Sequence, residues 1–121
     1  MKFQLLLFIL YKKLVRAASG NDRFQNFIKN KQLKFTIKTS SGAQGRQFIF
    51  DNGKISSSSN IRTGCDAAMV WCDGNTAFKV MASGNDEASV AALTEKKLLA
   101  EGSFKEFMWF SRALDIMMGK A

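Results

Sequence analysis

Apolar residues open the chain at helical spacing. Phe3 and the run Leu5–Tyr11 are apolar, and the run is shorter than the roughly twenty apolar residues that a membrane-spanning helix needs. This spacing predicts an apolar and basic helical region over residues 1–31, and Gly20 is expected to break the helix. Apolar side chains extend beyond one face of this helix, which is compatible with contact to a partner or a membrane surface, but the pattern favours a well-buried first helix with a basic outer edge. The cations on its outer side are Lys2, Lys12, Lys13 and Arg16.

Alternation of apolar and polar residues follows, which is typical of half-buried strands. The clearest case is Leu33–Ile37, where lysine and threonine separate the apolar residues. Asn52-Gly53 is a strong hairpin signal. The pattern predicts a meander of antiparallel strands, with the serine-rich one at an edge. Its strands are expected at residues 33–38, 47–51, 55–59 and 65–71.

Helical periodicity returns after Cys72. Asp73 can cap a short helix that ends at Gly84, and Asn85 or Asp86 can cap a second one. The last two elements are expected to be an edge strand and a strongly amphipathic helix, at residues 97–101 and 104–118.

Composition narrows the chemistry that the chain can perform. The 121 residues, 46% of them hydrophobic, have the size and make-up of one globular domain, 1–121. The sequence has no histidine, which excludes a Ser-His-Asp triad, a Cys-His dyad and a histidine-bound zinc. Cys65 and Cys72 lack metal-ligand spacing, and we interpret them as reduced, buried or half-buried apolar residues. No pair of residues has the spacing that activates a nucleophile, so we expect no enzyme, metal or cofactor.

Charge is divided unevenly along the chain. Residues 1–62 hold twelve lysines and arginines and two acids, a net charge of +10, whereas residues 63–121 hold six and eight, a net charge of −2. The basic half can attract anionic lipid or nucleic acid, or it can serve as solubility charge on exposed strand faces. A nucleic-acid-binding module is the weaker alternative, because the sequence has neither an arginine-rich recognition helix nor an RNA-recognition motif.

The compartment follows from the N-terminal region and the cysteines. Three cations stand between the apolar run and the small residues Ala17–Ser19, which is unusual for a cleaved signal peptide. Reduced cysteines favour a reducing compartment. We therefore expect a cytoplasmic protein, free or peripherally bound to a membrane, and not a secreted one.

The order of elements resembles that of a known family. Thr76–Met117 is similar to the end of sterol carrier protein 2-like domains, where two short helices, a strand and an apolar helix follow one another. Lys97–Gly102 matches the Lys-Leu and later Gly of that strand, although Lys96 replaces the preceding glycine, and Asp51–Gly53 looks like the family's earlier hairpin. Over residues 33–118 the resemblance implies an α+β fold: a five-stranded, mainly antiparallel sheet covered by helices, with an apolar tunnel.

The resemblance also implies a function. Such domains bind sterols, fatty acyl chains or prenyl lipids and assist lipid transfer without catalysis. Eleven Phe, six Met and two Trp suit an adaptable cavity, although the residues alone favour a close-packed core and only the resemblance favours the cavity. The closing helix is the expected lid, because its Met-rich end lies near the chain terminus. The expected tunnel wall is Phe48, Phe50, Met69, Trp71, Phe78, Met81, Phe104, Phe107, Met108, Met117 and Met118.

A structural role is the second interpretation. The apolar terminal helices could pack on a partner chain or on a membrane surface, and the first helix would then join a homo- or hetero-oligomer. As a carrier, the chain would use Lys2, Lys12, Lys13 and Arg16 to dock on anionic membrane. The sequence leaves carrier and scaffold open.

Overall fold

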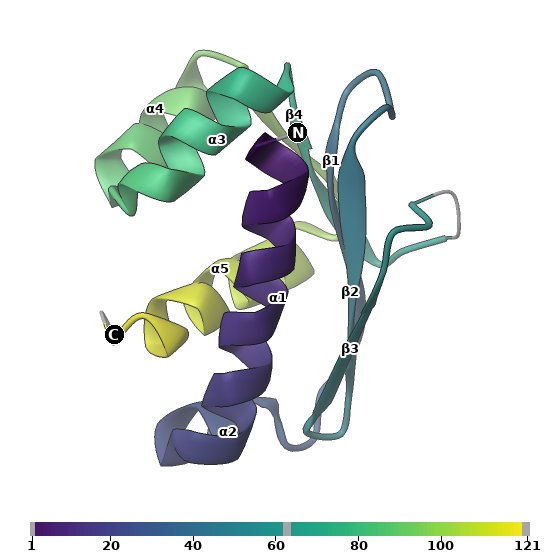
Figure 1. The fold of residues 1–121 in the computed structure, drawn as a ribbon, viewed down its shortest axis with the longest axis vertical. Helices are drawn as coiled ribbons and strands as arrows, with labels where there is room; N and C mark the ends of the chain where they lie inside the picture. Colours follow the sequence, from purple (N-terminus) through teal and green to yellow (C-terminus); the bar gives the residue numbers. More distant parts are fainter. Residues whose placement is uncertain (1, 62–63, 120–121) are drawn as a thin grey trace.

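The structure is a computed structural model that describes residues 2–61 and 64–119. Within these residues, five helices and five strands form two layers, with the helices gathered on one face of the sheet (Figure 1). In chain order, the elements are α1 (Lys2–Gly20), α2 (Asp22–Ile28), β1 (Gln32–Thr39), β2 (Gly45–Asp51), β3 (Lys54–Ser58), β4 (Ala67–Trp71), α3 (Gly74–Ser83), α4 (Asp86–Thr94), β5 (Leu98–Gly102) and α5 (Phe104–Met117).

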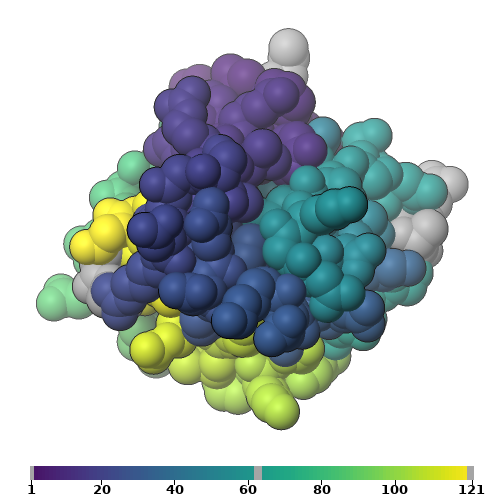
Figure 2. Space-filling view, turned by 90° about the horizontal axis from the view of Figure 1, so that it is seen from below, coloured from purple at the N-terminus to yellow at the C-terminus, as the bar shows by residue number. Residues whose placement is uncertain are grey.

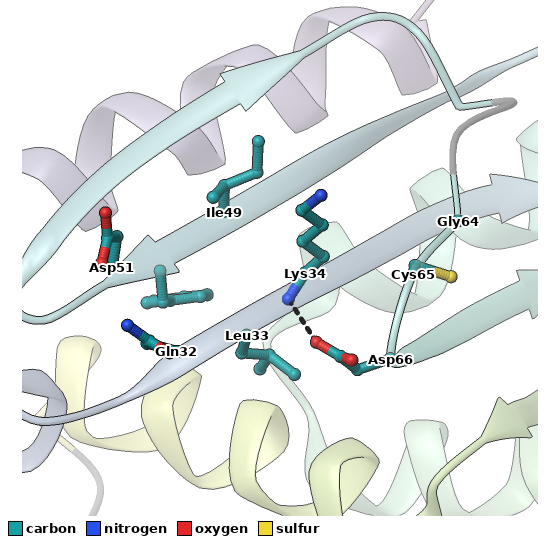
Figure 3. Close-up of a pocket in the computed structure, with 9 residues that line it drawn as sticks. Gln32, Leu33, Lys34, Ile49, Asp51, Gly64, Cys65 and Asp66 are labelled. Carbon is teal, nitrogen blue, oxygen red and sulfur yellow. Dashed lines mark hydrogen bonds between the residues drawn. The ribbon is translucent and has the colours of Figure 1, made fainter.

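The sheet has the strand order β3-β2-β1-β4-β5. Three of its four pairings are antiparallel, so the predicted five-stranded, mainly antiparallel sheet is confirmed. The predicted meander is wrong, because β4 pairs with β1 in parallel. Gly64, shortly before β4, lies on the face opposite the helices, where its carbonyl accepts a hydrogen bond from Gln47 Nε2 at 3.3 Å (Figure 3). The serine-rich β3 and β5 are the edges, as predicted.

Phenylalanine rings form the centre of the core. We call Phe35, Phe48, Phe50, Phe107 and Phe110 the aromatic block. The rings of Phe35 and Phe110 stack with their centroids 4.0 Å apart, while Phe48 and Phe50 approach Phe110 at 5.8 and 6.0 Å. Aromatic pairs of this kind contribute about 0.5–1.5 kcal/mol each beyond the area that they bury. The aromatic block therefore attaches α5 directly to β1 and β2.

Predicted caps define the shorter helices. The Asp73 side chain accepts from the Thr76 N–H at 2.7 Å to start α3, and Gly84 ends it in the left-handed conformation. Asn85 caps α4 by accepting from the Glu87 N–H at 2.8 Å. Ser103 caps α5 in the same way, through the N–H of the third residue that follows it. The polar residues at these turns thus determine where α3, α4 and α5 begin.

The prediction that the two cysteines are buried or half-buried is wrong. Both are free thiols, but both are exposed. The strand predicted over residues 65–71 is shorter in the structure, since β4 begins at Ala67 and ends at Trp71. Cys65 therefore precedes the strand on the open face, and Cys72 follows it at the start of α3, where neither side chain enters the core.

Candidate functional site

The strand residues expected in the tunnel wall all face the helices. Phe48 and Phe50 are buried on β2, and Met69 and Trp71 are buried on β4. Ladder pairing aligns β4 with the inward residues of β1, such as Ile37 opposite Met69, so the four side chains lie on one face of the sheet. The alternating pattern placed this part of the candidate wall correctly with respect to the two faces.

The helix residues of the candidate wall are divided between interior and surface. Phe107 is buried against the sheet, and Phe78, Met81 and Met117 are half-buried. The remaining three, Phe104, Met108 and Met118, are 62%, 52% and 46% exposed on the outer side of α5.

The structure therefore brings the strand residues and Phe107 together and leaves three α5 residues outside. The buried side of α5 is the row Phe107, Phe110, Ala113 and Ile116, spaced every three residues. Of these, Phe110 makes the closest ring contact with the sheet, yet the candidate wall did not contain it. The signal that could have found it is this three-residue spacing, which lines up one face of a helix.

Two surface hollows are present. One, of about 690 Å³, lies on the open face of the sheet between β1, β2 and the segment Gly64–Asp66 (Figure 3). The Asp66 carboxylate there accepts a hydrogen bond from the Lys34 backbone N–H at 2.8 Å. The other, of about 360 Å³, lies beside α5 and is lined by Lys31, Lys105, Glu106, Met108, Trp109 and Arg112.

The space between the sheet and α5 is occupied by side chains in this state. The aromatic block fills it with rings in mutual contact. Seen from below, the atoms of α1, α2, β3 and α5 that the view describes meet without a deep opening between the layers (Figure 2). A ligand in the expected position must therefore displace side chains or a helix.

The first half of α5 is tied to the segment after α2. Lys31 Nζ lies 2.6 Å from Glu106 Oε1, and both side chains are only about one-fifth exposed, at 22% and 18%. Lys31 also lies over the ring of Trp109, with Nζ 5.1 Å from the ring centroid. Trp109 in turn stacks on Phe27 of α2, with the ring centroids 4.9 Å apart. These contacts hold the first half of α5.

The outer side of α1 combines cations with apolar side chains. Lys2, Lys12, Lys13 and Arg16 are exposed. Beside them, Leu5 is 61% exposed and Phe8 and Ile9 are 42% exposed each. Lys12 Nζ lies 5.3 Å from the ring centroid of Phe8, a cation–π contact at the surface. Among the described residues, α1 and the other helices lack the length and hydropathy that a membrane span requires.

The titratable groups with shifted pKa values serve local structure. Hydrogen bonds from the backbone and side chain of Thr76 lower the pKa of Asp73, the cap of α3. Glu95 raises the pKa of Lys97 by a hydrogen bond and by its charge. In residues 2–61 and 64–119, Cys, Asp and Glu side chains form no group of three that could hold a metal ion.

Comparison with known proteins gives the class of fold. No protein-family model and no curated protein match the sequence. Among solved structures, sterol carrier protein 2 is similar at a TM-score of 0.57 and 11% identity, over 91% of each chain. The chain has the sterol carrier protein 2-like fold, and the resemblance inferred from the sequence is confirmed at this level.

Two further structures are informative. The UbiJ-SCP2 ubiquinone synthesis protein has a TM-score of 0.62 and 11% identity, with 90% of this chain and 89% of that chain covered. The sec-alkylsulfatase Pisa1 from Pseudomonas sp. has a TM-score of 0.51 and 9% identity, with 72% of this chain but only 14% of that chain covered. The same fold thus occurs both as nearly a whole chain and as a small part of a larger enzyme.

Proposed function

We propose that the protein is a non-catalytic lipid-binding and lipid-transfer domain. It would hold a sterol, a fatty acyl chain or a prenyl lipid between the sheet and α5. The observation that carries the proposal is the fold shared with sterol carrier protein 2 over 91% of both chains. The large apolar layer at the same interface, including Phe48, Phe50 and Phe107, supports it.

Binding would exchange internal contacts for contacts with the ligand. Each methylene removed from water contributes about 0.8 kcal/mol, so a chain of a dozen carbons supplies about 10 kcal/mol toward moving α5. α5 is suited to act as the lid because the Lys31–Glu106 ion pair and the Trp109 stack hold only its first half, whereas Met117 is half-buried and Met118 exposed at its other end, so that opening there breaks fewer contacts. On opening, a turn of α5 about its axis would bring Phe104, Met108 and Met118 toward the ligand. The Met side chains of this surface are flexible enough to follow ligands of different shape.

The wall of the site is proposed from three elements besides the lid. β2 and β4 supply the sheet side, and α3 supplies Phe78 and Met81, which are half-buried beside it. The proposed wall is Phe48, Phe50, Met69, Trp71, Phe78, Met81, Phe104, Phe107, Met108, Met117 and Met118.

Native mass spectrometry of the protein purified from cells tests this function, followed by titration with the fluorescent fatty acid cis-parinaric acid. A co-purifying lipid mass and saturable uptake are expected. Met81→Asp should reduce uptake by placing a charge in the proposed wall. Val90→Asp, a change of the same kind at a position 61% exposed, is the control. Empty protein that also fails to take up the probe would contradict the proposal.

We further propose that α1 docks the carrier on anionic membrane. Its exposed cations attract anionic lipid by about 1 kcal/mol each near the surface, and residues 2–20 contain no acid to oppose them. Co-sedimentation with phosphatidylserine-containing vesicles should fall for the double variant Lys12→Glu, Lys13→Glu. Lys105→Glu, which changes an exposed cation on α5, should leave it nearly unchanged. A loss of binding free energy in Lys105→Glu about half that of the double variant would mean that net charge alone determines binding, because the control reverses one charge instead of two.

An assembly role is the second candidate function. Exposure of Leu5, Phe8 and Ile9 on one side of α1 favours it, because a partner chain could bury them. Light scattering after size exclusion, with and without the substitutions Leu5→Ser and Ile9→Ser, measures the mass in solution. A dimer or larger species that the substitutions convert to monomer supports assembly through α1. A monomer at every concentration supports the carrier.

A further inference from the structure

Trp71 is the last residue of β4 and is 1% exposed. Its side chain lies on the helix-covered face, and its neighbours in the ladder are Thr39 on β1 and Leu98 on β5. The backbone of Trp71 is satisfied, since its carbonyl accepts from the Ser40 N–H at 2.8 Å. In contrast, the indole Nε1–H has no hydrogen-bond acceptor within the part of the chain that the structure describes.

A buried indole N–H without an acceptor is uncommon. Tryptophan offers one donor and no acceptor, and it usually finds a partner when it is buried. The nearby Thr39 hydroxyl does not fill this role, because it contacts Ser41 Oγ at 3.2 Å and the Gln44 carbonyl at 3.4 Å. An acceptor for Trp71 can therefore come from an ordered water molecule or from a bound ligand that takes the place of that water.

The surroundings restrict the chemistry of that acceptor. The buried polar or charged residues of the described chain are Thr36, Thr39 and Gln47, and none of them carries a charge. A carboxylate next to Trp71 would thus lack a buried cation to pair with, which makes its desolvation costly. A neutral carbonyl or hydroxyl oxygen accepts the same hydrogen bond without this cost.

We propose that the Trp71 indole N–H is the polar anchor of the lipid site and binds a neutral oxygen at the head of an otherwise apolar ligand. This inference rests on the proposed function and specifies the class of ligand: a ketone, quinone, ester or alcohol, in preference to a free fatty acid. Trp71 pairs with Thr39, four residues along β1 from Phe35, which is about 13 Å at the rise of a strand. The apolar part of the ligand can therefore run from Trp71 to the aromatic block.

Competition between matched ligands tests the anchor. Diphenylhexatriene, a fluorescent hydrocarbon without an acceptor, is bound first and then displaced by 2-pentadecanone or by pentadecane delivered from cyclodextrin. The two competitors share a chain and differ in one carbonyl oxygen. Wild type should prefer the ketone by about tenfold, because the ketone satisfies a buried donor. Trp71→Phe should reduce this preference to within about twofold, whereas Trp109→Phe should keep it.

Nuclear magnetic resonance gives a direct readout in the wild-type protein. The two indole N–H signals are assigned with the variants Trp71→Phe and Trp109→Phe. The ketone should move the Trp71 indole proton downfield, and pentadecane should not. Should Trp71→Phe fail to fold, this shift in wild type still decides the question, with Trp109→Phe sufficient for the assignment.

The outcomes separate the anchor from the carrier function. An unchanged ketone preference in Trp71→Phe, or an indole proton that the ketone does not shift, overturns the anchor while carrier function stands. If palmitate shifts the Trp71 signal and competes as well as the ketone, the proposal that the head group of the ligand is neutral is overturned. Failure of diphenylhexatriene and of every competitor to bind wild type overturns the proposed function itself, and the anchor with it.

Discussion

The two ends of the helix-covered face are built differently. Over β1 and β2, the phenylalanine rings of the aromatic block pack against one another. The Lys31–Glu106 ion pair holds the first turn of α5 against the segment that follows α2. Over β4 and β5, α3 and α4 share the cover with α5 and bury only one alanine each, and Trp71 has a donor without an acceptor among the described residues. Close packing and satisfied polar groups make the end over β1 and β2 resistant to opening. Opening the end over β4 and β5 breaks fewer contacts and therefore costs less free energy. We therefore expect ligand-induced movement to begin near β4.

The largest effect is expected from opening a cavity in the aromatic block. Phe110→Ala should lower the free energy of unfolding by about 3–5 kcal/mol, because it removes the ring that contacts three phenylalanines of the sheet. Phe104→Ala, at a position 62% exposed on the same helix, should lower it by only about 1 kcal/mol, because among the described residues its ring stacks on Phe107 alone. Urea unfolding measures both. Similar losses in the two variants would mean that the ring packing described here does not support the fold.

A smaller effect is expected at the joint between β4 and β5. Gly102 has φ +76°, and a Cβ there would lie 2.5 Å from the Asp66 carbonyl oxygen. Gly102→Ala should cost about 1–3 kcal/mol, since strain and close contact add. Gly42 has φ +77°, and no atom lies within 4 Å of a Cβ added there. Gly42→Ala therefore measures the cost of the backbone conformation alone, without the close contact. In thermal unfolding, Gly102→Ala should have a lower melting temperature than Gly42→Ala. The reverse order would show that β5 can shift away from Asp66 at little cost and relieve the close contact.

The ion pair at the start of α5 tests which part of the lid moves. A double-mutant cycle with Lys31→Met and Glu106→Gln should give a coupling of about 0.5–1 kcal/mol. If the whole helix opens, uptake of cis-parinaric acid should accelerate up to about fivefold in Lys31→Met, by stopped-flow fluorescence. If opening is confined to the β4 end, the rate should stay constant. Glu95→Gln, which removes an exposed ion pair with Lys97, is the control.

The smallest effect concerns the cap of α3. The pKa of Asp73 is lowered from 3.8, so the carboxylate stabilises the folded state above that pH, and this contribution is lost as pH falls through the lower folded-state value. Asp73→Ala should slightly lower the melting temperature at pH 7. The difference between the variant and wild type should shrink as the pH falls below 3.8 and the carboxylate is protonated. A difference that is constant down to pH 2.5 would show that the charge of Asp73 contributes nothing.

Local patterns were sufficient to predict most elements of this fold. The alternation at Leu33–Ile37, the hairpin at Asn52-Gly53 and the caps at Asp73 and Asn85 depend on neighbours in sequence, and the structure contains each of them. The parallel pairing of β4 with β1 could not be predicted in this way. It depends on contacts between residues 32 positions apart in sequence, such as Phe35 and Ala67, and alternation describes the faces of a strand but not its partner.

The candidate site was predictable on the sheet and not on α5. Strand alternation correctly oriented Met69 and Trp71 because a strand has only two faces. In α5, Phe107, Met108, Trp109 and Phe110 are consecutive and apolar, so the three-residue spacing that contains Phe110 is one of several inward faces that the hydrophobic pattern allows. The ring stacking of Phe110 on Phe35 determines which of these faces points inward, through a contact between residues far apart in sequence.

The parallel neighbour of β1 also has a consequence for synthesis on the ribosome. The hairpins of β1, β2 and β3 are complete at Ser58, but β1 has no second neighbour until Trp71 has been made. A nascent chain of intermediate length would thus present an unpaired apolar strand edge, the feature from which misassociation between chains starts. Translation pauses that leave β1–β3 outside the ribosome but β4 still inside it should promote aggregation, whereas pauses after β4 has emerged should be harmless.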